Sequence, residues 1–179
     1  QVLTYFLNGK EIPFANKGEL EKQLPFLKKK FLYADDFAKA KLTDIFSKSM
    51  LSNSVTYSAD CFENAVFINE GQLNFTMKPF PWEAQLTTYR SAVVMDANGD
   101  KLPDLLLGGN FRENNIQMGR YDADYGTVLV NKGKGDFEVK PLGISIKGQV
   151  KRLKAIKIQG KTYILVVRNN DTLMVLSQV

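Results

Sequence analysis

Three carboxylates and one carboxamide lie close together in a single stretch of the chain, residues 96–104. They occupy positions 1, 3, 5 and 9 of that stretch, where a tightly curled loop can direct all four side chains inward. Carboxylates this close repel one another, and a hard cation such as Ca²⁺, which takes about six to eight oxygen ligands, removes that cost. The main-chain carbonyl of position 7 supplies a further oxygen. The spacing therefore predicts a calcium site formed by Asp96, Asn98, Asp100, Leu102 and Asp104.

This loop does not follow the EF-hand pattern. Lys101 stands at position 6, where the EF-hand has Gly, and Leu107 stands at position 12, where it has a bidentate Glu. The flanking runs, residues 92–95 and 105–107, are short and apolar, which is typical of buried strands. The alternative to an ion site is a polar hairpin turn. We favour the ion because a turn requires only one or two such residues.

Composition excludes several classes of enzyme. The 179 residues include no His and one Cys, Cys61, so a Ser-His-Asp or Cys-His mechanism within this chain is excluded, as are an internal disulfide and a multi-cysteine metal site. The net charge of +5 is mild, and the basic residues are not interleaved with exposed aromatics as in a nucleic-acid groove. No run of about 18 apolar residues predicts a membrane span.

The chain changes its hydrophobic period twice. Residues 2–7 are typical of a strand, and an Asn-Gly turn follows. Asn16 and Glu19 then form the pattern of a helical capping box, and apolar residues recur at helical spacing to about residue 52. From Cys61 onward the pattern is that of strands. We therefore expect a mainly β chain with a small α-helical insertion at residues 16–52.

An internal repeat with a constant offset of 62 residues links two segments, 67–79 and 129–141. Asn69 corresponds to Asn131, and Phe75 corresponds to Phe137. Each copy predicts a hairpin with an Asn-x-Gly turn. The same offset carries residues 92–95 onto 154–157, so that the acidic loop has a counterpart at residues 159–161 without any carboxylate.

A repeat of about sixty residues with four short strands is typical of a β-propeller blade. We therefore predict about two and a half four-stranded antiparallel blades in a single propeller-fragment domain, residues 1–179. The predicted parts are a strand and hairpin of a partial blade (1–15), the helical insertion (16–52), the remainder of that blade (61–81), a complete repeat (88–143) and a degenerate terminal repeat (148–179).

The acidic stretch, the following Leu-Leu-Leu-Gly-Gly and the segment 131–137 resemble the FG-GAP/VCBS repeat of integrin-α-like propellers. The whole chain resembles the C-terminal region of ASPIC/UnbV-associated VCBS repeat proteins of Bacteroidetes. This resemblance implies that the acidic loop binds Ca²⁺, although Lys101 stands where the family usually has Gly. It also implies an exported protein, extracellular, on the cell surface or in the periplasm, with a binding or scaffold role and a protein or glycan partner. The same resemblance implies that the protein is not an enzyme.

The segment 110–124 is long for a hairpin connection, and long loops in compact folds are often functional. An ordinary solvated loop packed over a neighbouring blade is an equal alternative. Within the loop, Asp122 and Asp124 are compatible with a second ion site, although such residues more often line a turn. The partner-binding candidates are Arg112, Asn114, Asn115, Arg120, Tyr121, Asp122 and Asp124.

A glycan-binding module is the alternative function. Aromatic side chains beside Asn and Asp could stack on sugar rings, and the candidates are Trp82, Tyr89, Tyr121 and Tyr125. For Trp82 we expect core packing instead, because Pro79 and Pro81 flank it in a predicted linker between blades.

Overall fold

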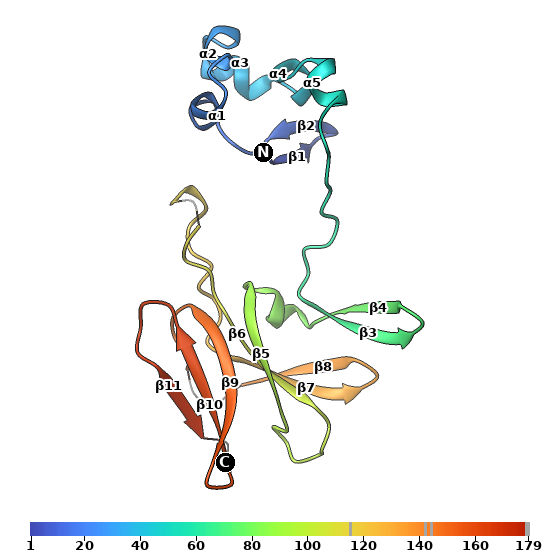
Figure 1. The fold of residues 1–179 in the computed structure, drawn as a ribbon, viewed down its shortest axis with the longest axis vertical. Coiled ribbons are helices and arrows are strands. Elements are labelled where there is room, and N and C mark those ends of the chain that lie inside the picture. Colours follow the sequence, from blue (N-terminus) through green and yellow to red (C-terminus); the bar gives the residue numbers. More distant parts are fainter. Residues whose placement is uncertain (115, 142, 144, 178–179) are drawn as a thin grey trace. The chain divides into compact units, whose positions relative to one another are not determined.

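The computed structural model describes residues 1–114, 116–141, 143 and 145–177. It is mainly β, as predicted, and the chain divides into two compact units, Gln1–Ala59 and Asp60–Val179. Each unit is described by itself below, and Figure 1 labels their elements. The chain was predicted to form a single domain, whereas it forms two compact units.

The first unit begins with a hairpin and continues as short helices. Strands β1 (Thr4–Leu7) and β2 (Lys10–Pro13) pair antiparallel through a turn in which Asn8 and Gly9 both have positive φ. The helices are α1 (Lys17–Gln23), α2 (Leu27–Lys30), α3 (Ala34–Lys39), α4 (Leu42–Ile45) and α5 (Lys48–Ser52). These bounds confirm the predicted helical segment, and the Asn16–Glu19 capping box is present. None of the helices in the described residues is both long and apolar enough to span a membrane.

A four-stranded antiparallel sheet forms the centre of the second unit. Its strands follow the chain in the order β5-β6-β7-β8, so each pairs with its neighbour in sequence. Their bounds are β5 (Tyr89–Met95), β6 (Asp104–Gly109), β7 (Thr127–Gly133) and β8 (Asp136–Pro141). These four strands lie within the predicted complete repeat, residues 88–143. Strand β6 is the most buried of them, since five of its six residues are buried and the other is partly buried.

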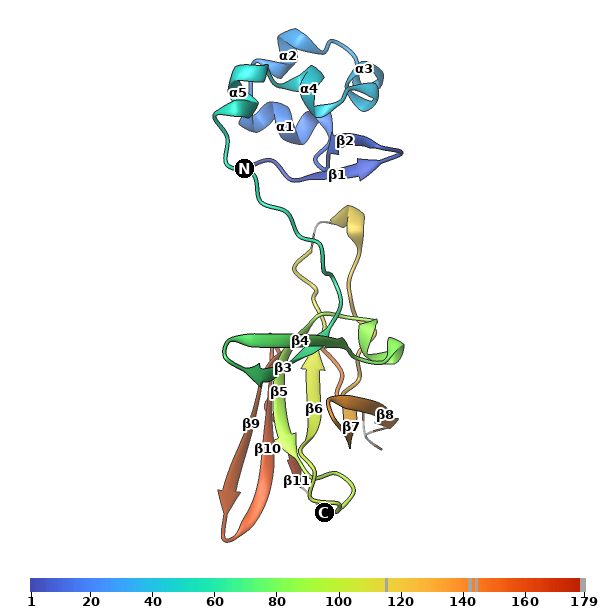
Figure 2. The ribbon, with the colours of Figure 1, turned by 90° about the vertical axis from the view of Figure 1, so that its right-hand side faces the viewer.

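Both faces of this sheet are covered. On one face Leu106 and Val128 share a core with Val150 and Ile164, which belong to a three-stranded sheet of order β11-β10-β9. On the other face Leu107 and Leu129 pack with Ala84 of the 3₁₀ helix η1 (Trp82–Gln85) and with partly buried aromatics. The remaining bounds are β3 (Ala65–Gly71), β4 (Asn74–Pro79), β9 (Val150–Ile158), β10 (Lys161–Arg168), β11 (Met174–Ser177) and η2 (Ile116–Met118). Figure 2 shows β3 and β4 crossing the direction of β5 and β6.

The predicted 62-residue repeat is confirmed in the two hairpins β3–β4 and β7–β8. Their bounds differ by 62 residues at every strand end. Asn69 pairs with Phe75 as Asn131 pairs with Phe137, and each hairpin shifts its register directly after that Asn. In each turn the Asn Oδ1 accepts a hydrogen bond from the main-chain N–H two residues on, at 2.9 Å for Asn69 and 2.8 Å for Asn131.

The first predicted blade differs from the structure. Residues 1–15 and 61–81 were expected to share one partial blade, whereas β1–β2 and β3–β4 are separate two-stranded sheets in different units. The first unit buries a core of its own, which includes Leu20, Leu27 and Ile45, and this core accounts for its compactness. The described sheets are small and open, so they show antiparallel repeats, and the propeller remains a proposal.

The contact between the two repeated hairpins leads to a first prediction. Gly133 and Gly135 both have positive φ, but only at Gly135 would a Cβ overlap another side chain, that of Ile68 on β3. We expect Gly133→Ala to lower the free energy of unfolding by about 1–2 kcal/mol, the cost of a left-handed Ala. We expect Gly135→Ala to lower it further, because Ile68 must move as well. Urea unfolding measures both values.

The double variant Gly135→Ala/Ile68→Val provides the control. Since Val lacks the overlapping Cδ1, the two substitutions should couple, so that the double variant is more stable than the sum of the single effects predicts. Strictly additive effects would contradict the contact.

Candidate functional site

Asp104 anchors the acidic loop to the sheet. It is the first residue of β6, pairs with Met95 at the end of β5, and is 0% exposed. Its Oδ2 accepts a hydrogen bond from the main-chain N–H of Ala97 at 2.7 Å, and its Oδ1 accepts one from Asn131 of β7 at 2.8 Å. One buried carboxylate therefore joins the loop between β5 and β6 to the next strand. The side-chain amide of Asn131 adds a hydrogen bond to the carbonyl of Pro103.

The other oxygen-bearing side chains of the loop turn toward its backbone. Asp96 accepts hydrogen bonds from the N–H groups of Gly99 at 2.7 Å and Lys101 at 3.0 Å. Asn98 accepts from the N–H of Asp100 at 3.1 Å and donates from its amide to that residue's carboxylate at 2.7 Å. The side chains at loop positions 1, 3 and 9 thus all accept hydrogen bonds from the loop's own main chain.

Asp100 is the exposed carboxylate of the loop, whereas Asp96 is partly buried and Asp104 is buried. The N–H of Leu102 donates to its Oδ1 at 2.7 Å, and this hydrogen bond, with that from the Asn98 amide, lowers the pKa of the carboxyl group below its usual value. Asp100 therefore stays ionised in neutral solution.

The loop contains backbone strain at Lys101. Lys101 has φ +67°, and Gly99 has φ +81°. A left-handed conformation suits Gly but costs a side-chain-bearing residue roughly 1–2 kcal/mol. Lys101 therefore adopts the conformation for which a Gly would be preferred.

The donor chemistry of the loop suits a hard cation, because every predicted ligand offers oxygen. Its described geometry is less specific: among the described residues, no three His, Cys, Asp or Glu side chains gather closely enough to hold a metal ion. Asp104 already uses both oxygens on N–H groups, and Leu102 uses its N–H on Asp100. The calcium set of Asp96, Asn98, Asp100, Leu102 and Asp104 thus stays a prediction.

The long segment between β6 and β7, called the extension below, contains an antiparallel bridge between Phe111 and Tyr121. Phe111 and Tyr121 exchange both main-chain hydrogen bonds, at 2.8 and 2.9 Å. Arg112 forms a two-pronged ion pair with Asp122, its Nη2 lying 2.9 and 2.8 Å from the two carboxylate oxygens. At the base, the Arg90 guanidinium lies 4.9 Å from the centroid of the Phe111 ring, a cation–π distance.

Asp124 closes this extension from inside the protein. It is 4% exposed, and it accepts hydrogen bonds from the N–H of Gly109 and Gly126 and from the hydroxyl of Thr127. Burial raises the pKa of its carboxyl group, and the three hydrogen bonds act in the opposite direction. Asn110, also buried, bonds to the main chain of Asp124 on both sides. Asp124 was predicted to meet a partner, but its burial makes it inaccessible.

The remaining partner candidates are distributed along the extension. Arg120 and Tyr121 are exposed, and Arg112 and Asp122 are half-exposed and committed to each other. Asn114 is partly buried, and Asn115 lies outside the described residues. Asn110, which sequence reasoning missed, carried no signal beyond its place directly after the Gly-Gly end of β6.

The aromatic candidates for sugar stacking occupy different environments. Trp82 is 70% exposed, so its expected place in the core is wrong. Tyr121 and Tyr125 are exposed as well. Tyr89 is partly buried; its hydroxyl lies 2.9 Å from the Thr127 hydroxyl, and burial raises its pKa to about 12. Three of the four rings therefore remain accessible.

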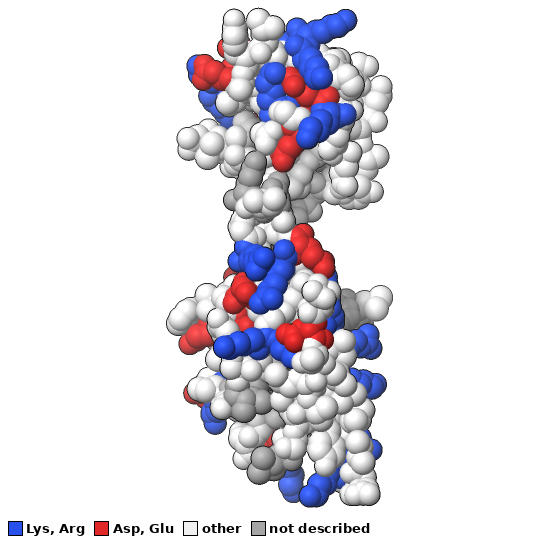
Figure 3. All heavy atoms as spheres, turned by 90° about the vertical axis from the view of Figure 1, so that its left-hand side faces the viewer, with Lys and Arg blue, Asp and Glu red and all other residues white. Residues whose placement is uncertain are grey.

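Charge and comparison with known proteins add little to this assignment. On the face shown in Figure 3, basic and acidic side chains lie among one another.

Comparison of the chain with known protein families, curated proteins and solved structures gives no match. Any functional assignment therefore depends on the residues themselves.

Two carboxylates of the extension form a matched pair for mutation. Asp124→Ala leaves two main-chain N–H groups and one hydroxyl without their buried acceptor, and we expect a loss of about 2–4 kcal/mol in the free energy of unfolding, at about 1–3 kcal/mol for each unsatisfied group with partial relief by water. Asp122→Ala removes a half-exposed ion pair and should cost at most about 1 kcal/mol. Urea unfolding of both variants measures the difference. Equal losses would contradict the structural role of Asp124.

Proposed function

We propose that this chain is a non-catalytic binding or scaffold segment of a larger repeat protein that acts outside the cell or in the periplasm, and that Ca²⁺ binds in its acidic loop. The observation that carries the proposal is the attachment of that loop. The buried Asp104 joins the loop to β7, and the three other oxygen-bearing side chains, Asp96, Asn98 and Asp100, lie at alternate positions before it.

A calcium ion in this loop would neutralise the carboxylates that the segment between β5 and β6 carries at residues 96, 100 and 104. The protein's own part is to hold those carboxylates in place before the ion arrives. Hydrogen bonds from Gly99 and Lys101 to Asp96, and from Leu102 to Asp100, do this at the cost of a strained Lys101. Preorganisation reduces the ordering that binding requires.

The repeat supports the assignment to an array. The two hairpins β3–β4 and β7–β8 have the same register at a spacing of 62 residues, and the sheet β9–β11 covers one face of β5–β8. This arrangement supports about two and a half blades of a β-propeller, with the loop of residues 110–124 as a partner-facing edge. The extracellular or periplasmic location is supported by the resemblance of the acidic stretch alone.

Glycan binding is the alternative function, and one observation favours it. Trp82 is 70% exposed on the short helix η1, although this Trp was expected to pack inward. Large exposed rings are the usual platforms for stacking, so a glycan array with wild type and Trp82→Ala separates this alternative from a protein partner.

The calcium proposal predicts a specific change in thermal stability. A ligand that binds only the folded state raises the free energy of unfolding by roughly 2.7 kcal/mol at a hundredfold excess over its Kd. We expect Ca²⁺ to raise the Tm of the wild type relative to chelator. Asp100→Asn should abolish the shift, because it removes one charge while an amide oxygen can still accept the hydrogen bond from Leu102.

Asp36→Asn, the same change on an exposed residue of α3, is the matched control and should keep the full shift. Lys101→Gly should raise the Tm in chelator, since it relieves a left-handed side chain worth roughly 1–2 kcal/mol, and should also enlarge the calcium shift. The absence of any shift at millimolar Ca²⁺ in both wild type and Lys101→Gly would refute the ion site.

A further inference from the structure

Strand β3 has one edge that no strand of the described residues covers. In its two-stranded sheet β3 pairs only with β4, whereas its repeat counterpart β7 pairs with β8 on one side and β6 on the other. Leu105, Leu106 and Leu107 of β6 lie opposite Leu129, Val128 and Thr127 of β7. Subtracting the 62-residue offset gives the equivalent positions on β3, which are Phe67, Val66 and Ala65.

Burial shows the effect of the missing neighbour. Leu129 is 0% exposed in β7, whereas its counterpart Phe67 is 63% exposed in β3. Val128 is buried, whereas Val66 is only partly so. The same hairpin, with the same register and the same turn, thus exposes apolar side chains at the positions that β6 covers in the second copy.

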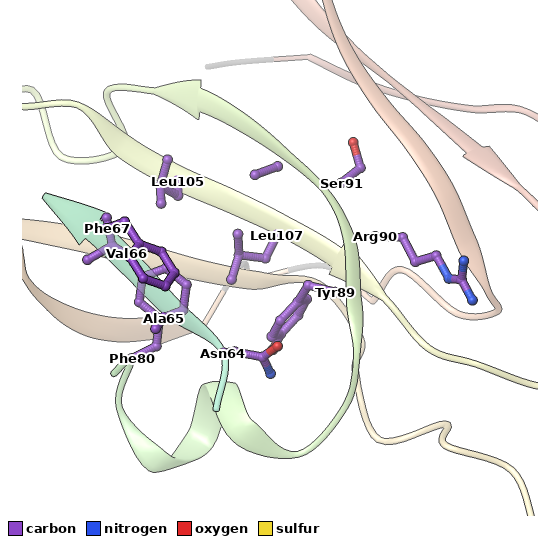
Figure 4. A pocket seen from close by; sticks show the side chains of 11 residues that line it. Asn64, Ala65, Val66, Phe67, Phe80, Tyr89, Arg90, Ser91, Leu105 and Leu107 are labelled. Carbon is purple, nitrogen blue, oxygen red and sulfur yellow. The ribbon is translucent and has the colours of Figure 1, made fainter. Parts of the chain in front are cut away.

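A cavity of about 460 Å³ lies at this edge. Its lining contains Ala65, Val66 and Phe67 on one side and residues of β5 and β6 on the other, Leu105 and Leu107 among them. Figure 4 shows these side chains facing the same space, with Phe67 beside Leu105 and with Tyr89 and Asn64 at one end. The residues that would pair with an added strand are therefore the same residues that line the cavity.

Asn69, near the end of β3, indicates which residue an added strand would begin with. In β7 the main-chain N–H of Asn131 donates to the carboxylate of Asp104, and its side-chain amide donates to the carbonyl of Pro103. Asn69 holds the same position in β3, and its Oδ1 makes the same turn hydrogen bond to Gly71. Asn69 therefore offers the same two donors to an acidic residue and to the carbonyl before it.

We propose that β3 binds an extended strand of a partner polypeptide by β-augmentation, antiparallel and in the register that β6 adopts on β7. The strand begins with an acidic residue held by Asn69 and continues with aliphatic residues, of which alternate side chains enter the cavity over Leu105 and Leu107. Added strands of this kind gain affinity from main-chain hydrogen bonds and specificity from alternate side-chain pockets. The inference deepens the proposed binding function and depends on it for its partner class.

A polypeptide fits this edge better than a small ligand does. The cavity is open along an unpaired main chain, and the structure already contains one example of the complex, β6 on β7, whose sequence is acidic at its first residue and then aliphatic. A sugar cannot form the regular series of hydrogen bonds that a strand would form with the edge N–H groups of β3, and it would face mostly apolar side chains.

The test uses the full chain and a labelled synthetic peptide with the sequence of residues 103–109, Pro-Asp-Leu-Leu-Leu-Gly-Gly. Fluorescence anisotropy in chelator measures binding, and hydrogen exchange of the chain with and without peptide locates it. We expect saturable binding with new protection at those N–H groups of residues 65–69 that point away from β4. An Asp→Asn peptide should bind about tenfold more weakly, since a charge-assisted hydrogen bond is worth about 1.5–3 kcal/mol and 1.4 kcal/mol is tenfold.

Two controls guard against unspecific binding. A peptide N-methylated at alternate leucines cannot form the ladder and should not bind. Phe67→Glu, on the cavity, should abolish binding, whereas Phe75→Glu, equally exposed on β4, should not. Because the assay is run without Ca²⁺, its failure leaves the calcium proposal standing, and a missing calcium shift leaves the peptide result intact.

Three results would overturn the inference. The first is no binding at millimolar peptide, or protection elsewhere in the chain. The second is protection, in the monomeric chain alone, of the N–H groups of residues 65–69 that point away from β4, because a strand would then already cover the edge. The third is protection that rises with protein concentration together with a dimer in sedimentation, because a second copy would then be the occupant.

Discussion

The second unit depends on one buried anion. The carboxylate of Asp104 lies at the junction of two connections, because one oxygen holds the loop before β6 and the other holds the main chain of β7. An isolated charge in such a place would be costly, and hydrogen bonds from main-chain N–H groups remove most of that cost. The acidic loop can therefore be strongly curved without detaching from the sheet, and any ion in it would act directly on the most buried strand, β6.

Around this anchor the sheet is built as a layer with two apolar faces. Leu106 and Leu107, neighbours in β6, point to opposite faces, and each belongs to a different core cluster. A strand that is buried on both faces needs a continuous apolar run, and the sequence of β6 supplies it. The sheet β9–β11 on one face and the helix η1 on the other are then held by side chains from the same short segment, which explains why the strand after the acidic loop organises the unit.

Sequence reasoning predicted those features that have a local or periodic signal. The Asn16–Glu19 capping box, the helical segment and the repeat of the two hairpins are all present, because each depends on residue types at fixed spacing. It failed for Trp82 and Asp124, whose exposure depends on neighbours that no local pattern encodes. The prediction that residues 1–15 and 61–81 share one blade was also wrong, since sheet pairing across a long insertion has no periodic signature.

The contact between the repeated hairpins has a direction. The Lys78 ammonium, at the end of β4, reaches the turn of the following hairpin, where it donates to the carbonyl of Lys134 and pairs with Asp136. Ile68 fills the space over Gly135 in the same turn. One hairpin thus presents its strand and the next presents its turn, so the two surfaces are different and complementary. Units joined in this way stack head to tail, and an array built from them has polarity: it can be extended at either end, but each new unit fits in one orientation only.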